Sequence, residues 1–266
     1  MVVSQAPAAG TEFTAGLILI DKPVGPTSFR VVQQVRRALQ IKKVGHTGTL
    51  DPFASGLLII CIGRPATRLI PQLMLGDKLY EAEMRLGVET DTLDLEGQVL
   101  AERPVPVLNM DEVRVCLDRF TGAQLQAPPA FSAVKHQGKP LYHYARQGVV
   151  IAKEPRPVRI DELTCTFLRG DSLGIRVRCS KGTYIRTLAA DIGRALGCGA
   201  HLTALRRLEN GPFSVAAAVP GELLADRDAA RVTLLAQAMD VAAVERLIRE
   251  QEAGGFACTE PEPVFA

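Results

Sequence analysis

The sequence predicts a mixed α+β fold from two kinds of pattern. Short apolar runs such as Leu17–Ile20 and Leu57–Ile62 are typical of buried strands. In contrast, Val31, Val35 and Leu39 recur every four residues, as on one face of a helix. Because strand-like and helix-like segments do not alternate regularly along the chain, the pattern favours an α+β domain over a doubly wound parallel sheet.

The N-terminal elements follow from the residues that break and cap them. Two prolines and a glycine end the first strand, and a helix is expected to begin near Thr27 or Ser28. Residues 45–56 are crowded with Gly, Thr, Asp and Pro, which predicts an irregular loop before the next strand. Loops between buried elements often carry functional residues.

In the second half of the chain, a change of period predicts a strand followed directly by a helix. The odd-numbered residues of Leu173–Cys179 are apolar and alternate with Arg176, Arg178 and Ser180, which predicts one buried and one cationic face. From Thr183 the apolar residues follow helical spacing as far as Gly197, a typical helix end. Further elements are expected as strands over Tyr80–Leu86 and Val158–Phe167, and as helices over residues 141–147 and 241–248.

The net charge of the chain does not indicate by itself what the protein binds. The 266-residue chain has 31 Lys and Arg against 29 Asp and Glu, so its net charge of +2 does not by itself indicate nucleic-acid binding. Basic residues are frequent in the middle of the chain, whereas acids gather at Glu89–Glu96 and after Glu245. This segregation is consistent with a basic face and equally with ordinary solvated charge.

The chain lacks the sequence signals of membrane, secreted and zinc proteins. No apolar run approaches the roughly 18 residues that cross a bilayer, and no basic residue precedes an apolar core near the N-terminus. We therefore expect a cytoplasmic protein without membrane attachment. The six cysteines include no Cys-x-x-Cys pair, so neither a disulfide framework nor a zinc site is predicted.

Two stretches are candidates for chemistry. Gly45–Pro52 places the imidazole of His46 and the carboxylate of Asp51 in a turn-rich segment, although Asp before Pro is also a common turn former. Ser180–Arg186 brings an aromatic hydroxyl and a guanidinium to the start of the predicted helix, where a capped helix with an exposed arginine is the alternative. The residues alone leave both interpretations open.

Several blocks of sequence resemble one known family. The blocks are Leu19–Pro23, Val44–Pro52, Ser55–Leu58, Asp77–Tyr80, Leu86–Gly87, Pro128–Lys135, Tyr144–Gly148, Ser180–Arg186 and Gly199–Arg207. In this order they resemble the TruB family, the bacterial tRNA pseudouridine-55 synthases, from Gly16 to about Pro212. The resemblance implies a mixed, largely antiparallel sheet flanked by helices, with an RNA-gripping insertion.

The resemblance also implies a reaction and a partner. The uracil of the T-loop uridine in tRNA is detached from its ribose and turns, and carbon 5 replaces nitrogen 1 at the sugar. Neither a cofactor nor a metal is implied. The partner is the T-arm stem-loop of tRNA, and we expect a monomer without an obligate protein partner.

Site residues are carried over from the family motifs position by position. Asp51 matches the catalytic aspartate, which acts either as a nucleophile or as a base on the ribose. Arg186 matches the arginine that pairs with it, and Tyr80 matches the tyrosine that stacks on the base near its carbon 5 proton. His46 matches the residue that enters the T-loop, while Tyr184 and Leu205 match the uracil-pocket wall.

Five basic residues are expected at the RNA. Three of them lie in the insertion, at about residues 124–150, and two lie in other motif blocks. They are Lys22, Lys135, Lys139, Arg146 and Lys181. If they contact phosphates, binding affinity falls with salt concentration.

The predicted domain organisation has one catalytic domain, over residues 16–215, between a flexible tail at 1–15 and a helical segment at 216–252. A second flexible tail is expected at 253–266, and no C-terminal PUA-type domain is recognisable.

Two rival functions stay open. One is a catalytically silent RNA-binding or tRNA-folding protein, and the other is a small-molecule lyase that uses Asp51 and Tyr80.

Overall fold

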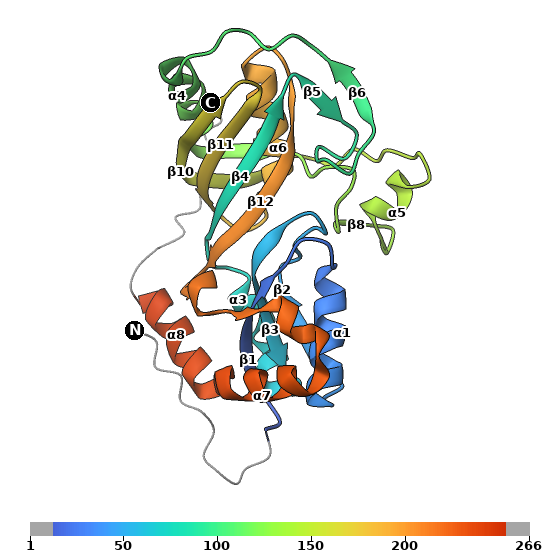
Figure 1. Cartoon of the computed structure of the whole chain (residues 1–266), viewed down its shortest axis with the longest axis vertical. Helices are drawn as coiled ribbons and strands as arrows, with labels where there is room; N and C mark the ends of the chain where they lie inside the picture. Colours follow the sequence, from blue (N-terminus) through green and yellow to red (C-terminus); the bar gives the residue numbers. More distant parts are fainter. Residues whose placement is uncertain (1–12, 254–266) are drawn as a thin grey trace, which may run out of the picture. The chain divides into compact units, whose positions relative to one another are not determined.

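The computed structural model describes residues 13–253, which fold into two compact units (Figure 1). The first unit combines residues 13–78 with residues 206–253, and the second comprises Leu79–Leu205. The tails predicted at the two ends lie almost entirely outside the described residues. The unit boundaries differ from those expected for the catalytic domain, because the C-terminal helices join the N-terminal strands.

The first unit is a small sheet with helices on both faces. Its strand order is β14-β1-β3-β12, with β2 paired to β3 and β13 to β12. The strands are β1 (Gly16–Lys22), β2 (Val44–Thr47), β3 (Ser55–Ile62), the end of β12 (Ala200–Asn210), β13 (Phe213–Ser214) and β14 (Val219–Pro220). The helices are α1 (Ser28–Leu39), α2 (Gly63–Arg68), α3 (Ile70–Leu73), η1 (Val215–Ala217), η2 (Gly221–Ala225), α7 (Arg227–Gln237) and α8 (Val241–Ala253).

Both faces of β1 are buried, which explains its continuous apolar run. Ile18 and Ile20 pack under α1 and α7, whereas Leu17 and Leu19 pack with residues of α2, α3 and α8. The predicted helical stripe of α1 faces the first of these clusters. Thr27 caps α1 by accepting a hydrogen bond from the backbone N–H of Arg30.

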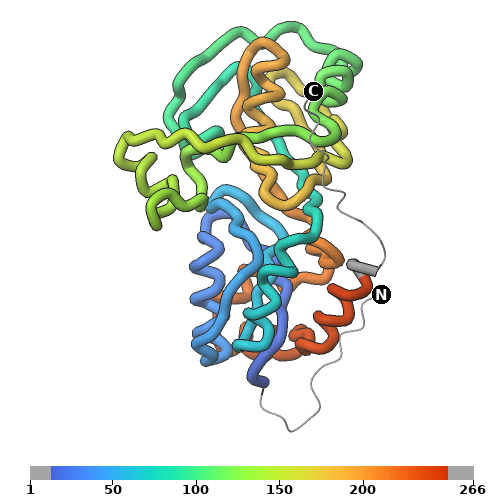
Figure 2. Tube along the Cα trace, turned by 180° about the vertical axis from the view of Figure 1, so that it is seen from behind, coloured from blue at the N-terminus to red at the C-terminus, as the bar shows by residue number. Residues whose placement is uncertain are grey.

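The second unit has a longer sheet in the order β12-β4-β11-β10-β7, with α4 packed on β10 and α6 beside it (Figure 1). Its strands are β4 (Lys78–Leu86), β5 (Val88–Thr90), β6 (Val99–Glu102), β7 (Gly122–Gln126), β8 (Lys135–His136), β9 (Lys139–Pro140), β10 (Arg156–Arg169) and β11 (Ser172–Cys179). Its helices are α4 (Met110–Asp118), α5 (Leu141–Ala145) and α6 (Ile185–Ala195). Figure 2 shows the predicted insertion as a separate excursion that carries β8, β9 and α5.

The predicted α+β class is confirmed, as are β1, α1 and the β11–α6 succession. Three expectations are corrected. The expected loop at residues 45–56 begins as strand β2, because β2 pairs with the buried strand β3. The helix expected over 141–147 ends at Ala145. The cationic face of β11 is neutralised by acids of adjacent strands, since Arg176 pairs with Glu81 and its neighbour Arg178 pairs with Glu162.

Candidate active site

The Asp51 loop of the first unit is anchored just before the aspartate. The Ser28 hydroxyl donates a hydrogen bond to the Leu50 carbonyl (2.9 Å) and accepts one from the Leu50 N–H (2.8 Å). Ser28 is 1% exposed, so water does not compete for these bonds. The backbone of the residue that precedes Asp51 is therefore held from both of its polar groups.

The same loop is anchored just after the aspartate. The Pro52 carbonyl accepts hydrogen bonds from the N–H of Gly25 (2.8 Å) and from the Lys22 ammonium (3.4 Å). Lys22 is fully buried and also donates to the carbonyls of Pro23 and Pro26, both at 2.8 Å. This burial does not fit the expected contact of Lys22 with RNA, because the charge is used to hold backbone carbonyls together.

A second buried cation, Arg207, reaches the start of the loop from β12. It is 2% exposed and donates through Nε to the Leu57 carbonyl (2.7 Å) and through Nη2 to the Gly48 carbonyl (3.2 Å). Strands β3 and β12 are so close here that a Cβ at Gly56 would lie 2.2 Å from the Arg207 carbonyl oxygen. Glycine is thus required at position 56, and Arg207 links the central strand to the loop.

His46 lies on β2 with its Nδ1 atom buried and without a hydrogen-bond partner among the described residues. Burial lowers the pKa of its imidazole, and the positive charge of Arg207 lowers it further, although the backbone of Gly48 acts in the opposite direction. The ring is therefore neutral near pH 7.

In the second unit, Arg186 is the centre of a buried polar cluster. Its guanidinium donates to the carbonyls of Thr92 (2.8 Å) and Phe131 (2.7 Å), and its Nη1 lies 3.4 Å from the carboxylate of Asp94. Asp94 in turn accepts from the Thr92 hydroxyl (2.6 Å) and from the N–H of Glu96 (3.0 Å). Arg186 is therefore a buried, oriented cation, and its expected pairing with Asp51 stays a prediction.

The other expected pocket residues also lie in the second unit. Tyr184 precedes α6, and its N–H and carbonyl both pair with the side-chain amide of Gln126, at 2.7 and 3.1 Å. Tyr80 on β4 and Leu205 on β12 are each 9% exposed. Gln126 therefore fixes the backbone of the predicted pocket tyrosine.

Two family models match the chain. One, described as TruB family pseudouridylate synthase (N terminal domain), matches residues 36–185. The other, described as tRNA pseudouridylate synthase B C-terminal domain, matches residues 186–252. The chain belongs to the TruB family. Residues 216–252, predicted to be helical, lie in the second match and contain β14 as well as α7 and α8.

Curated TruB relatives are similar over most of the chain. A tRNA pseudouridine synthase B of Desulfotalea psychrophila is 57% identical over 77% of this chain and 85% of its own length. Those of Aromatoleum aromaticum and Bordetella pertussis are 53% and 48% identical, over 77% and 83% of this chain and 66% and 91% of their own lengths. The Aromatoleum match thus spans just under two thirds of that relative.

Solved structures share the fold. The crystal structure of an archaeal box H/ACA sRNP Nop10–Cbf5 complex matches with a TM-score of 0.63 and 28% identity, over 87% of this chain and 61% of that chain. A Cbf5–Nop10–Gar1 complex matches with a TM-score of 0.68 and 25% identity, over 92% of this chain and 69% of that chain. This chain therefore spans less than two thirds of the first of these neighbours.

The basic residues expected at RNA in this TruB chain, apart from Lys22, are exposed. They are Lys135, Lys139, Arg146 and Lys181. The first two lie on the β8–β9 hairpin, whose turn has positive φ angles at Gln137 (48°) and Gly138 (80°). Exposed cations on a tight turn are accessible to a phosphate backbone.

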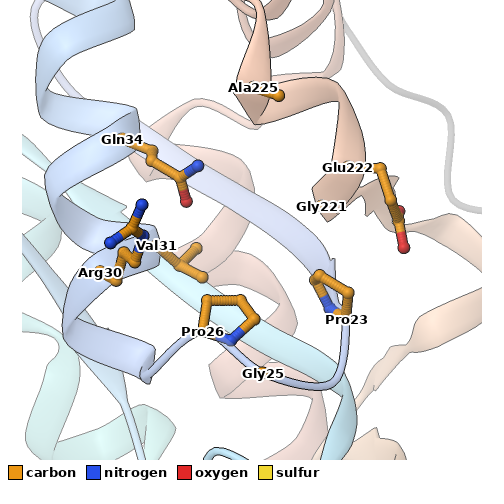
Figure 3. A pocket seen from close by; sticks show the side chains of 9 residues that line it. All are labelled: Pro23, Gly25, Pro26, Arg30, Val31, Gln34, Gly221, Glu222 and Ala225. Carbon is orange, nitrogen blue, oxygen red and sulfur yellow. The ribbon is translucent and has the colours of Figure 1, made fainter.

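A cavity of about 380 Å³ borders the segment of Pro23–Pro26, whose Gly25 donates a hydrogen bond to the Pro52 carbonyl (Figure 3). The rings of Pro23 and Pro26 line it, together with Arg30 and Gln34 of α1 and Glu222 of η2.

Among the described residues, no group of three or more His, Cys, Asp or Glu side chains is placed to hold a metal ion. Within residues 13–253, no helix is both long and apolar enough to span a membrane.

Several residues of these networks received no role from sequence reasoning. Ser28, Gln126 and Asp94 belong to no catalytic motif, and Arg207 stood in a motif block without an assigned function. Burial of a polar side chain next to a motif residue is the signal that reveals them. That signal exists in the folded chain alone.

Proposed function

We propose that this chain isomerises uridine to pseudouridine in tRNA, at the T-loop uridine of position 55. The bond between nitrogen 1 and the ribose breaks, a bond from carbon 5 to the same ribose carbon forms, carbon 5 loses its proton and nitrogen 1 gains one. The reaction conserves all atoms and needs no oxidant or reductant. Its substrate is the T-arm stem-loop, bound by a monomer without an obligate protein partner.

The restraint of the Asp51 loop is the observation that carries this proposal. Hydrogen bonds with the buried side chains of Ser28 and Lys22, and with the N–H of Gly25, hold the backbone before and after the aspartate, at Leu50 and Pro52. A restrained backbone at Asp51 leaves fewer conformations to be lost when its carboxylate is ordered in the transition state, which lowers the barrier for attack or proton removal. Membership of the TruB family supports the catalytic role of Asp51 over a purely structural turn.

The remaining roles are part of the same proposal. Tyr80 stacks on the target base and helps to move the carbon 5 proton, whereas Tyr184 and Leu205 wall the uracil pocket. His46 enters the T-loop in place of the flipped uridine and offsets part of its unstacking cost of a few kcal/mol. Arg186 supplies a fixed positive charge for an anion at the reaction centre. The basic residues of the β8–β9 hairpin bind phosphates.

Tritium release from unmodified tRNA that carries 5-tritiated uridine tests the proposal. We expect the wild-type protein to release tritium and Asp51→Asn, which is nearly isosteric and uncharged, to release none. Chemical mapping of the product is expected to place pseudouridine at the T-loop position alone. Tight tRNA binding without release would instead indicate an RNA-binding protein, and RNA-independent turnover of a small molecule would indicate a lyase.

A further inference from the structure

The N-terminal end of α1 carries two hydroxyl residues with different partners, Thr27 as the N-cap residue and Ser28 as the first residue of the helix. Thr27 caps the helix, because its Oγ1 accepts from the N–H of Arg30 at 3.1 Å. Ser28 points elsewhere, and its Oγ bonds both polar backbone groups of Leu50 at 2.8 and 2.9 Å. The hydroxyl of Ser28 is therefore not used to start the helix.

These two hydrogen bonds restrict the conformation of Asp51 through the peptide that joins it to Leu50. The Leu50 carbonyl and the Cα of Asp51 belong to one planar peptide unit. A donor that holds the carbonyl oxygen orients this plane, and the bond to the Leu50 N–H holds the preceding plane as well. Because Pro52 is held in turn by Gly25 and Lys22, Asp51 lies between two anchored carbonyl groups.

Ser28 is suited to this role by its position in the fold. It lies at the start of a helix whose Val31 and Val35 are at most 1% exposed, so its main chain is set by the core of the first unit. The Ser28 side chain has one rotatable bond before the oxygen, which leaves little freedom once that oxygen is bonded twice. The helix thus holds the Ser28 hydroxyl at a fixed position relative to the core, and the hydroxyl in turn holds the backbone of Leu50 in the Asp51 loop.

We propose that Ser28 is a positioning residue for catalysis, whose hydroxyl sets the orientation of Asp51. This proposal rests on the proposed function, since it assumes that the carboxylate of Asp51 carries the reaction. Ser28 itself takes no part in the chemistry. It lies outside the quoted sequence blocks, between Leu19–Pro23 and Val44–Pro52, and its role follows from its contacts with Leu50.

The test compares Ser28→Ala with Thr27→Ala, two variants that each remove one hydroxyl group from the same helix end. Tritium release is measured for both at a temperature at which thermal unfolding shows each to be folded. We expect Ser28→Ala to lower kcat by about 10- to 100-fold, as small misplacements of a reacting group do, with KM for tRNA nearly unchanged. Thr27→Ala is expected to keep kcat near the wild-type value.

A second readout does not depend on activity. Hydrogen exchange of the Leu50 amide is expected to accelerate by about tenfold or more in Ser28→Ala, which removes its acceptor, and to stay near the wild-type rate in Thr27→Ala. Ser28→Cys, whose thiol is a weak hydrogen-bonding group, is expected to give an intermediate kcat and an intermediate exchange rate. It also provides the comparison if Ser28→Ala does not fold.

The outcomes separate this proposal from the proposed function. If wild-type protein releases tritium and Asp51→Asn does not, but Ser28→Ala and Thr27→Ala have equal kcat, the positioning role is refuted and the proposed function stands. An unchanged Leu50 exchange rate in Ser28→Ala refutes the positioning role as well. If the wild-type protein itself releases no tritium, the proposed function fails, and the role of Ser28 fails with it.

Discussion

Arg186 and Asp94 form an ion pair inside the second unit, with Nη1 3.4 Å from Oδ2 and side chains that are 7% and 6% exposed. The arginine comes from a predicted functional motif and the aspartate from the acidic segment Glu89–Glu96. Asp94 also shapes its own turn by accepting from Thr92 and Glu96. The acid thus orients the arginine and the turn together.

We predict that Asp94→Asn destabilises the protein by about 1–3 kcal/mol, because it removes the charge that compensates a buried guanidinium while keeping the shape of the side chain. Glu96→Gln removes an exposed carboxylate from the same turn and is expected to change the free energy of unfolding by less than about 0.5 kcal/mol. Urea denaturation measures both. Equal effects of the two variants would contradict a specific role for Asp94.

Arg207→Lys is expected to lower both stability and activity. A lysine ammonium cannot occupy the Nε and Nη2 positions of Arg207 at once, so Leu57 or Gly48 loses a donor. The expected loss is about 2 kcal/mol of unfolding free energy, with a decrease in kcat because Gly48 lies in the Asp51 loop. Denaturation and tritium release measure the two effects.

The adjacent Arg206 provides the matched control for Arg207. It pairs with Asp21 at 2.6 Å, but its side chain is 39% exposed. Partly exposed ion pairs contribute little, so Arg206→Lys is expected to cost less than about 1 kcal/mol. A larger loss of unfolding free energy from Arg206→Lys than from Arg207→Lys would show that burial does not determine how much these arginines stabilise the protein.

His46 makes stability depend on pH. Because burial and Arg207 lower its folded-state pKa below 6.5, the unfolded chain binds a proton on this ring at a higher pH than the folded chain. Stability therefore falls as the pH decreases from about 6.5 toward the lower folded-state pKa, and it is fully present above that window. Denaturation across this range is expected to show that wild type loses stability relative to His46→Gln as the pH decreases, because the glutamine does not titrate. A constant difference between the two proteins would refute the effect.

Tyr80→Phe separates stacking from proton transfer. The ring that stacks on the base is kept, so tRNA binding is expected to stay near the wild-type level. Loss of the hydroxyl is expected to slow tritium release by about a hundredfold or more if it assists proton transfer. Tyr184→Phe, at the predicted pocket wall, is the control and is expected to have a much smaller effect. Unchanged release by Tyr80→Phe would exclude the proton role.

Lys135→Ala tests whether the β8–β9 hairpin binds phosphates. Each lost phosphate contact is expected to flatten the dependence of log affinity on log salt concentration by about 0.7 to 0.9. Arg85, whose guanidinium is 3.1 Å from the carboxylate of Asp171, is the control for net charge. Arg85→Ala is expected to leave the slope unchanged, as measured by filter binding over a salt series. The same slope for Lys135→Ala and wild type would remove Lys135 from the interface.

Local patterns predicted the elements whose formation depends on neighbours in sequence. The helical spacing of apolar residues in α1 and their alternation in β11 were sufficient to predict these two elements, since an apolar stripe or face must be buried. Strand β2 was not predicted, because its extended conformation results from pairing with β3 and cannot be read from its composition. Strand β12 was not predicted either, because Arg206, Arg207 and Glu209 interrupt its apolar alternation.

By itself the sequence determined the α+β class, the main strands and helices, and the turn that carries Asp51, because periodicity, Pro and Gly act over a few residues. Only the tertiary structure decided what the polar side chains do. Lys22 and Arg207 are buried against backbone carbonyls, and Ser28 holds Leu50. These roles depend on which distant segments pack together, since a buried polar group must find its partner wherever the fold brings one.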